Sequence, residues 1–172
     1  MNDYGKSKKD FEEFALSFGK KNKVNVIGLR YCNVYGPGEA HKGNMASMIY
    51  QLAKQIKDNK NPKIFEYGQQ KRDWIYVKDV VQANMKALEF KGVDIVNCGC
   101  GIACTFNELV ALVNKHLKTN FKPQYIENPF QSFYQEFTQC DIKKAQNLLD
   151  FVPSYDLDAG IKDYLNSTEF KH

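Results

Sequence analysis

Segments with the apolar spacing of a helix alternate with short runs rich in β-branched residues along most of this 172-residue chain. The first helical pattern, at 7–20, places three phenylalanines on one face. A β-rich run at 24–29 follows, and glycine and proline in 31–38 end it. Helix and strand patterns that alternate in this way predict an α/β fold.

The alternation continues to the end of the chain. Helices are expected to begin near residues 45, 79, 105, 141 and 156, and strands to span 63–67, 74–77, 95–97 and 124–126. A polar turn separates 63–67 from 74–77, so these two strands are expected to pair as a hairpin. Thr105 and Glu108 have the spacing of a capping box at the start of a helix. Residues 127–139 are aromatic and polar without a period, which is typical of a loop that faces a substrate.

Charge and hydropathy exclude several classes of function. The formal net charge is only +4, and the lysines are scattered along helices rather than gathered in a run, so no nucleic-acid-binding surface is expected. Polar residues follow Met1, and no stretch approaches the roughly 18 apolar residues of a membrane span. We therefore expect a cytoplasmic protein with neither a nucleic-acid nor a membrane partner.

Five cysteines are present, an odd number without a C-x-x-C pair. This count argues against a disulfide framework and predicts reduced thiols. The spacing of Cys98, Cys100 and Cys104 matches no common zinc pattern, so no metal site is expected.

Tyr4 and Lys8 are four residues apart at the start of the first helix, which places both side chains on one face. An ammonium group stabilises a neighbouring phenolate, so such a tyrosine can move a proton from a sugar hydroxyl. A lysine four residues after a tyrosine is also common on exposed helices. The pair alone leaves both interpretations open.

Three further motifs accompany this pair: Leu-Arg-Tyr-Cys-Asn-Val-Tyr-Gly-Pro-Gly at 29–38, Arg-Asp-Trp-Ile-Tyr-Val-Lys-Asp-Val at 72–80, and Asn-Cys-Gly-Cys-Gly at 97–101. In this order and spacing they resemble the extended short-chain dehydrogenase/reductase family, specifically its nucleotide-sugar epimerases and dehydratases. Residues 36–47 and 134–139 are similar to the branch of that family that epimerises ADP-linked heptoses.

The resemblance implies the C-terminal part of a Rossmann-type α/β fold, with the last strands of the sheet and a small substrate-binding domain. Residues 1–35 would be a remnant of the Rossmann domain that carries the Tyr-x-x-x-Lys helix, and 36–172 would be mainly the substrate-binding portion. The nucleotide-binding half is expected to be absent from the sequence, so the phenylalanine face and the edge of the 24–29 strand would meet water. We therefore expect the chain to be inactive without a partner half.

The resemblance also implies a cofactor and its contacts. NADP would take a hydride from C6 of the heptose and return it to the other face. Tyr4 and Lys42 would be the two acid/base groups, and Lys8 would hold the nicotinamide ribose. Val34 and Lys42 would contact the cofactor. Without the resemblance, Lys42 would be an ordinary loop lysine.

The substrate implied by the resemblance is an ADP-sugar. Its expected contacts are Asn33, Asn44, Gln51, Phe65, Glu66, Tyr67, Gly68, Arg72 and Tyr134. The guanidinium of Arg72 offers paired donors to a diphosphate, although an ion pair with Asp73 is an alternative. The ring of Phe65 would stack on adenine or, alternatively, belong to the core. Tyr134 would close over the substrate.

Gly99, Cys100 and Gly101 superficially suggest a dinucleotide-binding loop, but Cys104 replaces its third glycine, so we reject that interpretation. Two alternatives to the heptose enzyme stay open. One is another nucleotide-sugar epimerase or dehydratase, and the other is a non-catalytic remnant that binds nucleotide sugars. The complete enzyme would be a homo-oligomer, and a separate N-terminal half is a further possible partner.

Overall fold

The computed structural model describes residues 3–129 and 134–170. In chain order the elements are α1 (Asp3–Asn22), β1 (Val26–Tyr31), β2 (Asn33–Tyr35), η1 (Ala40–Met45), α2 (Met48–Lys57), β3 (Lys63–Phe65), β4 (Lys71–Tyr76), α3 (Val77–Glu89), β5 (Val93–Cys98), β6 (Ala103–Thr105), α4 (Phe106–Leu117), β7 (Gln124–Ile126), α5 (Lys143–Leu149), α6 (Leu157–Leu165) and η3 (Thr168–Phe170). Helices and strands alternate, as the sequence pattern predicts.

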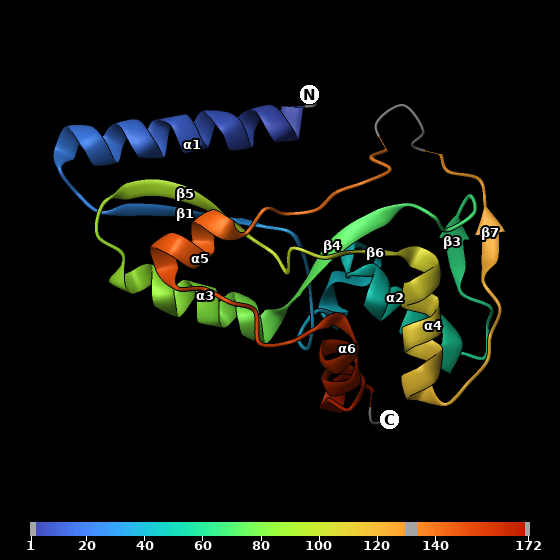
Figure 1. Cartoon of the computed structure of the whole chain (residues 1–172). Helices are drawn as coiled ribbons and strands as arrows, with labels where there is room; N and C mark the ends of the chain where they lie inside the picture. Colours follow the sequence, from blue (N-terminus) through green and yellow to red (C-terminus); the bar gives the residue numbers. More distant parts are fainter. Residues whose placement is uncertain (1–2, 130–133, 171–172) are drawn as a thin grey trace.

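One part of the molecule is built on the parallel pair β1–β5, in register from Val26 opposite Val93 to Tyr31 opposite Cys98. Helix α1 covers one face of this pair, and α3 and α5 lie on the other (Figure 1). The apolar side chains beneath α3 and α5 form one core cluster, which includes the fully buried Phe151. Strand β1 therefore packs with elements well beyond residue 35. The expected division of roles between 1–35 and 36–172 stays a prediction.

The other part contains the three-stranded sheet β2–β4–β6, the parallel pair β3–β7 and the helices α2, α4 and α6 (Figure 1). Its core cluster includes the fully buried Leu52, Leu109 and Ile161, one from each of these helices. Helix α4 begins with the expected capping box, because Thr105 accepts from the Glu108 backbone N–H and the Glu108 carboxylate accepts from the Thr105 N–H. Strand β4 joins the two parts, since Ile75 belongs to one core cluster and Trp74 to the other.

The expected hairpin between 63–67 and 74–77 is wrong. Strand β3 pairs in parallel with β7, whereas β4 pairs with β2 and β6. A polar turn between two strand patterns is a local signal, but the hydrogen-bonding partners here lie up to 61 residues away, as in Lys63 opposite Gln124. Strands β2 and β6 were not expected, because three residues are too few to show a period of two.

The expectation of reduced thiols is also wrong for two of the five cysteines. Cys32 and Cys140 form a disulfide across 108 residues of sequence, while Cys98, Cys100 and Cys104 are free. The cysteine count could not reveal this pair, because only the tertiary structure brings the two segments together.

Helix α1 packs closely at one end and is exposed over most of its length. A Cβ atom on Gly19 would lie 2.8 Å from a methyl group of Val26, so glycine permits the close approach of α1 to β1. The expected exposure of the phenylalanine face is confirmed, since Phe11 and Phe14 are 67% and 64% exposed. Across 3–129 and 134–170, no helix has both the length and the apolar character needed to cross a bilayer.

Candidate substrate cleft

A cleft of about 430 Å³ opens between α2, β3, β4 and the residue Tyr134. Its lining is mostly apolar or aromatic, with a few amides and cations placed among these side chains, as is usual for small-molecule sites. The lining residues are Asn33, Met48, Gln51, Gln55, Lys63, Ile64, Phe65, Arg72, Trp74, Phe106, Ile126 and Tyr134. Five of the nine substrate contacts expected from the sequence are thus brought together here: Asn33, Gln51, Phe65, Arg72 and Tyr134.

Arg72 supplies a partly buried cation to this cleft. Its guanidinium carbon lies 5.0 Å from the centre of the Tyr134 ring, and Nη1 donates to the Lys71 carbonyl at 2.8 Å. Burial lowers the pKa of Arg72 below its ordinary value, and Tyr134 opposes the shift. An arginine still keeps its charge at neutral pH. The cleft therefore offers a positive charge to an anionic ligand.

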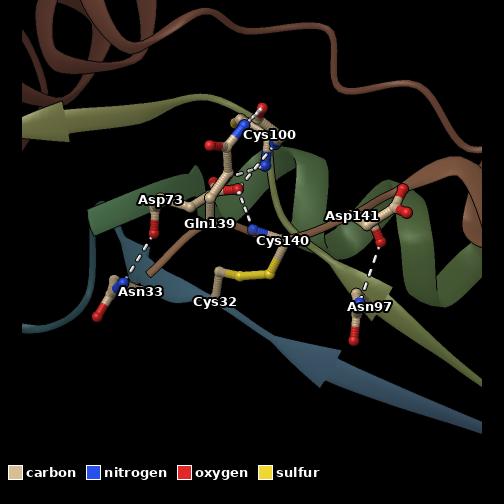
Figure 2. Close-up of a disulfide and its surroundings, with 9 residues drawn as sticks. Cys32, Asn33, Asp73, Asn97, Cys100, Gln139, Cys140 and Asp141 are labelled. Atoms are coloured by element: carbon tan, nitrogen blue, oxygen red, sulfur yellow. Dashed lines mark hydrogen bonds between the residues drawn. A yellow bond between two sulfur atoms is a disulfide. The ribbon is translucent and has the colours of Figure 1, made fainter. Parts of the chain in front are cut away.

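The alternative ion pair between Arg72 and Asp73 is not formed. The Asp73 carboxylate is fully buried and accepts hydrogen bonds from the backbone N–H groups of Cys100, Gly101 and Cys140, at 2.8, 2.8 and 3.1 Å (Figure 2). Adjacent residues of a strand point to opposite faces, so Arg72 and Asp73 serve different sites. Within the part of the chain that the structure describes, Arg72 has no carboxylate partner.

Two aromatic rings form one wall of the cleft. Phe65 and Tyr134 meet edge to face, with ring centres 5.8 Å apart and an interplanar angle of 83°. Phe65 is half-buried and lines the cleft, so an aromatic ring forms part of its wall. Gln70 donates to the Tyr134 hydroxyl at 3.4 Å. Strand β3 and the segment after residue 133 thus each contribute one ring to this wall.

Three amides add polar groups of fixed orientation. Asn33 donates through Nδ2 to the Asp73 carbonyl at 2.8 Å, and its side-chain oxygen accepts no hydrogen bond from the residues that the structure describes. Gln51 donates to the Ala46 carbonyl at 2.8 Å, and Gln55 Oε1 accepts from the Lys63 N–H at 3.0 Å. Amides held in this way can select between donors and acceptors on a ligand.

Four expected substrate contacts lie outside the lining of the main cleft. Glu66 and Tyr67 line a smaller hollow of about 220 Å³ that shares Tyr134 with the cleft. Gly68 has a φ of +68°, and a Cβ atom there would lie 2.6 Å from Asn107 Oδ1, so this glycine shapes a turn. The side chain of Asn44 is exposed, while its carbonyl accepts from Gln51 at 3.1 Å.

The expected catalytic and cofactor residues do not line the cleft either. Tyr4 is 70% exposed on α1, and the Lys8 ammonium lies 5.3 Å from the centre of its ring, so the structure does bring this pair together. Lys42 is exposed on η1. Val34 lies in β2 opposite Ile75 and packs against the core beneath α3.

Sequence reasoning missed several cleft residues, and two of them had a usable signal. Gln55 follows Gln51 by one helical turn, and Lys63 precedes Phe65 by two residues in a strand, so each shares a face with an expected contact. Trp74 had no such signal. It is the one tryptophan of the chain, it is buried, and its indole N–H has no hydrogen-bond partner within 3–129 and 134–170.

Two backbone N–H groups of the turn at 99–101 are engaged within the protein. The carboxylate of Asp73 occupies the N–H groups of Cys100 and Gly101, which a phosphate would otherwise need (Figure 2). The turn therefore anchors β4 to the end of β5.

Comparisons with known proteins agree on the relatives of this chain. Residues 1–99 match the sequence profile of the NAD dependent epimerase/dehydratase family. The ADP-L-glycero-D-manno-heptose-6-epimerase of Brachyspira hyodysenteriae is 39% identical over 175 aligned positions, which cover 98% of this chain and 55% of that enzyme. The chain thus spans about half the length of this curated relative.

Solved structures give the same result. The ADP-L-glycero-D-manno-heptose-6-epimerase of Helicobacter pylori matches 95% of this chain with a TM-score of 0.87 and 44% identity, over 50% of its own length. The UDP-glucose 4-epimerase of Thermotoga maritima, solved with UDP-glucose, matches 97% of this chain with a TM-score of 0.87 and 28% identity, over 52% of its length.

Proposed function

Because this chain belongs to the NAD-dependent epimerase/dehydratase family, we propose that it forms the ADP-sugar-binding part of an ADP-L-glycero-D-manno-heptose 6-epimerase. The observation that carries this proposal is Arg72, a half-buried cation without a carboxylate partner among the described residues, stacked on Tyr134 at the cleft. A guanidinium so placed would bind a diphosphate through paired hydrogen bonds.

The shape and chemistry of the cleft suit the rest of such a ligand. The ring of Phe65 would stack on the adenine base, and the hollow beside Glu66 and Tyr67 would hold the outer edge of the nucleotide. The side-chain oxygen of Asn33 would accept a hydrogen bond from a sugar hydroxyl. Lys63 would add a second cation near the diphosphate.

The catalytic part of the proposal rests on α1 and η1. Tyr4 and Lys42 would move protons on opposite faces of the sugar carbon, and Lys8 would stabilise the phenolate of Tyr4 and hold the nicotinamide ribose. The Tyr4–Lys8 pair suits the nicotinamide ribose of such a dinucleotide. The 172 residues contain no G-x-G-x-x-G loop that would bind its pyrophosphate. The proposed dinucleotide is NADP, which when bound accepts a hydride from the sugar and later returns it.

The proposal extends to the setting of the reaction. We place the protein in the cytoplasm, in the synthesis of the heptose of lipopolysaccharide, and we expect the complete enzyme to be a homo-oligomer. On its own, this chain would bind the ADP-sugar without turning it over.

Isothermal titration of the 172-residue chain with ADP-mannose tests the proposal, with UDP-glucose as the competing ligand. Emission of the single tryptophan reports whether binding occurs at the cleft, because Trp74 lines it. Arg72→Ala should weaken ADP-mannose binding about 30-fold, since a charge-assisted hydrogen bond contributes about 2 kcal/mol. Arg72→Lys keeps the charge but loses the paired donors, and about a fivefold loss is expected.

The results separate the candidate functions. Tighter binding of UDP-glucose than of ADP-mannose would favour another nucleotide-sugar enzyme of the same family. If a folded chain bound neither ligand, the proposed substrate cleft would be wrong.

A further inference from the structure

We propose that Cys32 and Cys140 are a redox modification site, a reversible dithiol–disulfide pair whose oxidised form tightens the substrate cleft. The identity of the ligand used below rests on the proposed function. The pairing of the two cysteines does not depend on it.

The two cysteines come from segments that only the fold brings together. Cys32 is the single residue between β1 and β2, and Cys140 lies between Phe137, which bridges to β4, and helix α5 (Figure 2). Their Cα atoms are 6.8 Å apart, within the range of disulfides. Gly99 packs against the bond, because a Cβ atom there would lie 2.8 Å from Cys140 Cβ and 2.9 Å from Cys32 Sγ. Glycine at position 99 therefore permits the close approach of this turn to the bonded pair.

A metal ion is a poor alternative for this cluster. The sulfurs of Cys32 and Cys140 and a carboxylate oxygen of Asp73 lie within 4.8 Å of one another. Both oxygens of that carboxylate are already occupied by backbone N–H groups, at distances of 2.8 to 3.1 Å. Two thiolates alone fall short of the four ligands of a structural zinc site.

The disulfide connects two walls of the cleft. Cys32 directly precedes Asn33, which lines the cleft and donates to the Asp73 carbonyl. Cys140 ends the segment 134–140, which begins with Tyr134, the aromatic wall that stacks on Arg72. Oxidation therefore closes a covalent ring that contains both walls.

Apart from the disulfide, non-covalent contacts hold the segment 134–140. It runs beside β4 through three backbone hydrogen bonds, from Lys71 to Glu136, from Thr138 to Lys71 and from Asp73 to Thr138, at 2.8 to 3.0 Å. The Cys140 N–H also donates to the Asp73 carboxylate, and the Gln139 side chain donates to the Gly101 carbonyl. Outside the single bridge of Phe137 to Lys71, the segment belongs to no strand or helix. Reduction would leave these contacts but remove the covalent restraint, so the segment that carries Tyr134 would be less ordered before a ligand binds. Part of the binding free energy would then be spent on ordering Tyr134, and the affinity for the ligand would fall.

The chemistry needs a thiol or disulfide partner of low molecular weight. In reduction, one thiolate of a dithiol attacks a sulfur of the Cys32–Cys140 bond and forms a mixed disulfide, and its second thiolate then displaces the other protein sulfur. Two protons and two electrons pass to the protein, and the reductant becomes a cyclic disulfide. Both cysteines are half-buried rather than fully enclosed. Disulfides in a reducing compartment are usually of this transient kind.

The other three thiols are not expected to take part. Burial raises the pKa of Cys98, Cys100 and Cys104 to about 12, which keeps them protonated and slow to react. Cys100 lies outside the substrate cleft, so Cys100→Ser serves as a matched control that should keep the redox response.

The test measures ADP-mannose affinity in the two redox states. The 172-residue chain is oxidised with glutathione disulfide or reduced with dithiothreitol, and peptide mass spectrometry after alkylation verifies the Cys32–Cys140 link. Titration should give about a fivefold lower dissociation constant for the oxidised chain, the lower end of usual coupling between two sites. Cys32→Ser and Cys140→Ser should both bind like the reduced chain in either buffer, whereas Cys100→Ser should behave like the wild type.

A second measurement does not depend on any variant. By linkage, saturating ADP-mannose should raise the equilibrium constant for disulfide formation by the same factor, read as the oxidised fraction across a series of dithiothreitol redox buffers. Equal affinities in the two states, or failure of the Cys32–Cys140 link to form under oxidation, would overturn the switch while leaving the substrate cleft in place. Absence of ADP-mannose binding by a chain with the verified link would instead overturn the proposed function, and the switch with it.

Discussion

Replacing Asp73 by alanine should remove a large share of the stability of this fold. The carboxylate is fully buried and accepts three backbone hydrogen bonds, from Cys100 and Gly101 at 2.8 Å and from Cys140 at 3.1 Å (Figure 2). Alanine would leave all three N–H groups without this acceptor.

The expected loss in the free energy of unfolding follows from the number of hydrogen bonds lost. Each buried donor that loses its acceptor costs about 1 to 3 kcal/mol, and part of this sum is offset because the variant no longer buries a charge. We therefore expect Asp73→Ala to lower the free energy of unfolding by about 4 kcal/mol, against a total of about 5 to 15 kcal/mol for a domain of ordinary stability. Asp79 offers an internal comparison, because its carboxylate is equally buried but accepts only two such bonds, from Ser154 and Tyr155. Asp79→Ala should cost about two thirds as much.

Urea unfolding followed by circular dichroism measures both losses. Glu13→Ala, at an exposed position on α1, is the control and should change the free energy of unfolding by less than about 0.5 kcal/mol. A loss below about 1 kcal/mol for Asp73→Ala, or one no larger than that of Asp79→Ala, would refute the view that this carboxylate anchors the turn at 99–101.

Three further predictions concern local features of the fold. Thr105→Ala removes the hydroxyl of the capping box and should cost about 1 kcal/mol in urea unfolding, with Thr119→Ala as a comparison outside the cap. Gly160→Ala should cost about 2 kcal/mol despite the better helix propensity of alanine, because the new Cβ would lie 2.0 Å from the hydroxyl of the buried Tyr35; a more stable variant would contradict this packing argument. A hydrogen bond from the Thr105 backbone lowers the pKa of the Glu108 carboxyl. The stability that this carboxylate contributes is therefore present above its ordinary pKa of about 4 and is lost as the pH falls through the lowered pKa of the folded state. Glu108→Gln should flatten the stability curve at acid pH, and unchanged curves would refute the assignment.

The composition of the candidate site was only partly accessible from the sequence. Arg72 and Tyr134 stand in motifs that could be recognised, and both line the cleft. Trp74 lines it as well, but nothing in its local pattern distinguishes a residue that faces a cleft from one that belongs to the core.

Local order, in contrast, was readable in detail. The apolar spacing of α2, the capping box of α4 and the strand β7 at 124–126 all occur where the sequence predicts them. These features depend on contacts within a few residues, so a single sequence contains the information needed to find them.

Long-range pairing was decided only by the tertiary structure. The sequence favoured a hairpin between neighbouring strands and reduced cysteines, whereas β3 pairs with β7 and Cys32 bonds to Cys140. Such partners are selected by how helices and strands pack on a shared core. The two cysteines are separated by 108 positions, and no local pattern in the sequence marks them as a pair. The sequence by itself therefore determined the helices, the longer strands and many of the chemical groups of the site, and packing decided which of them meet.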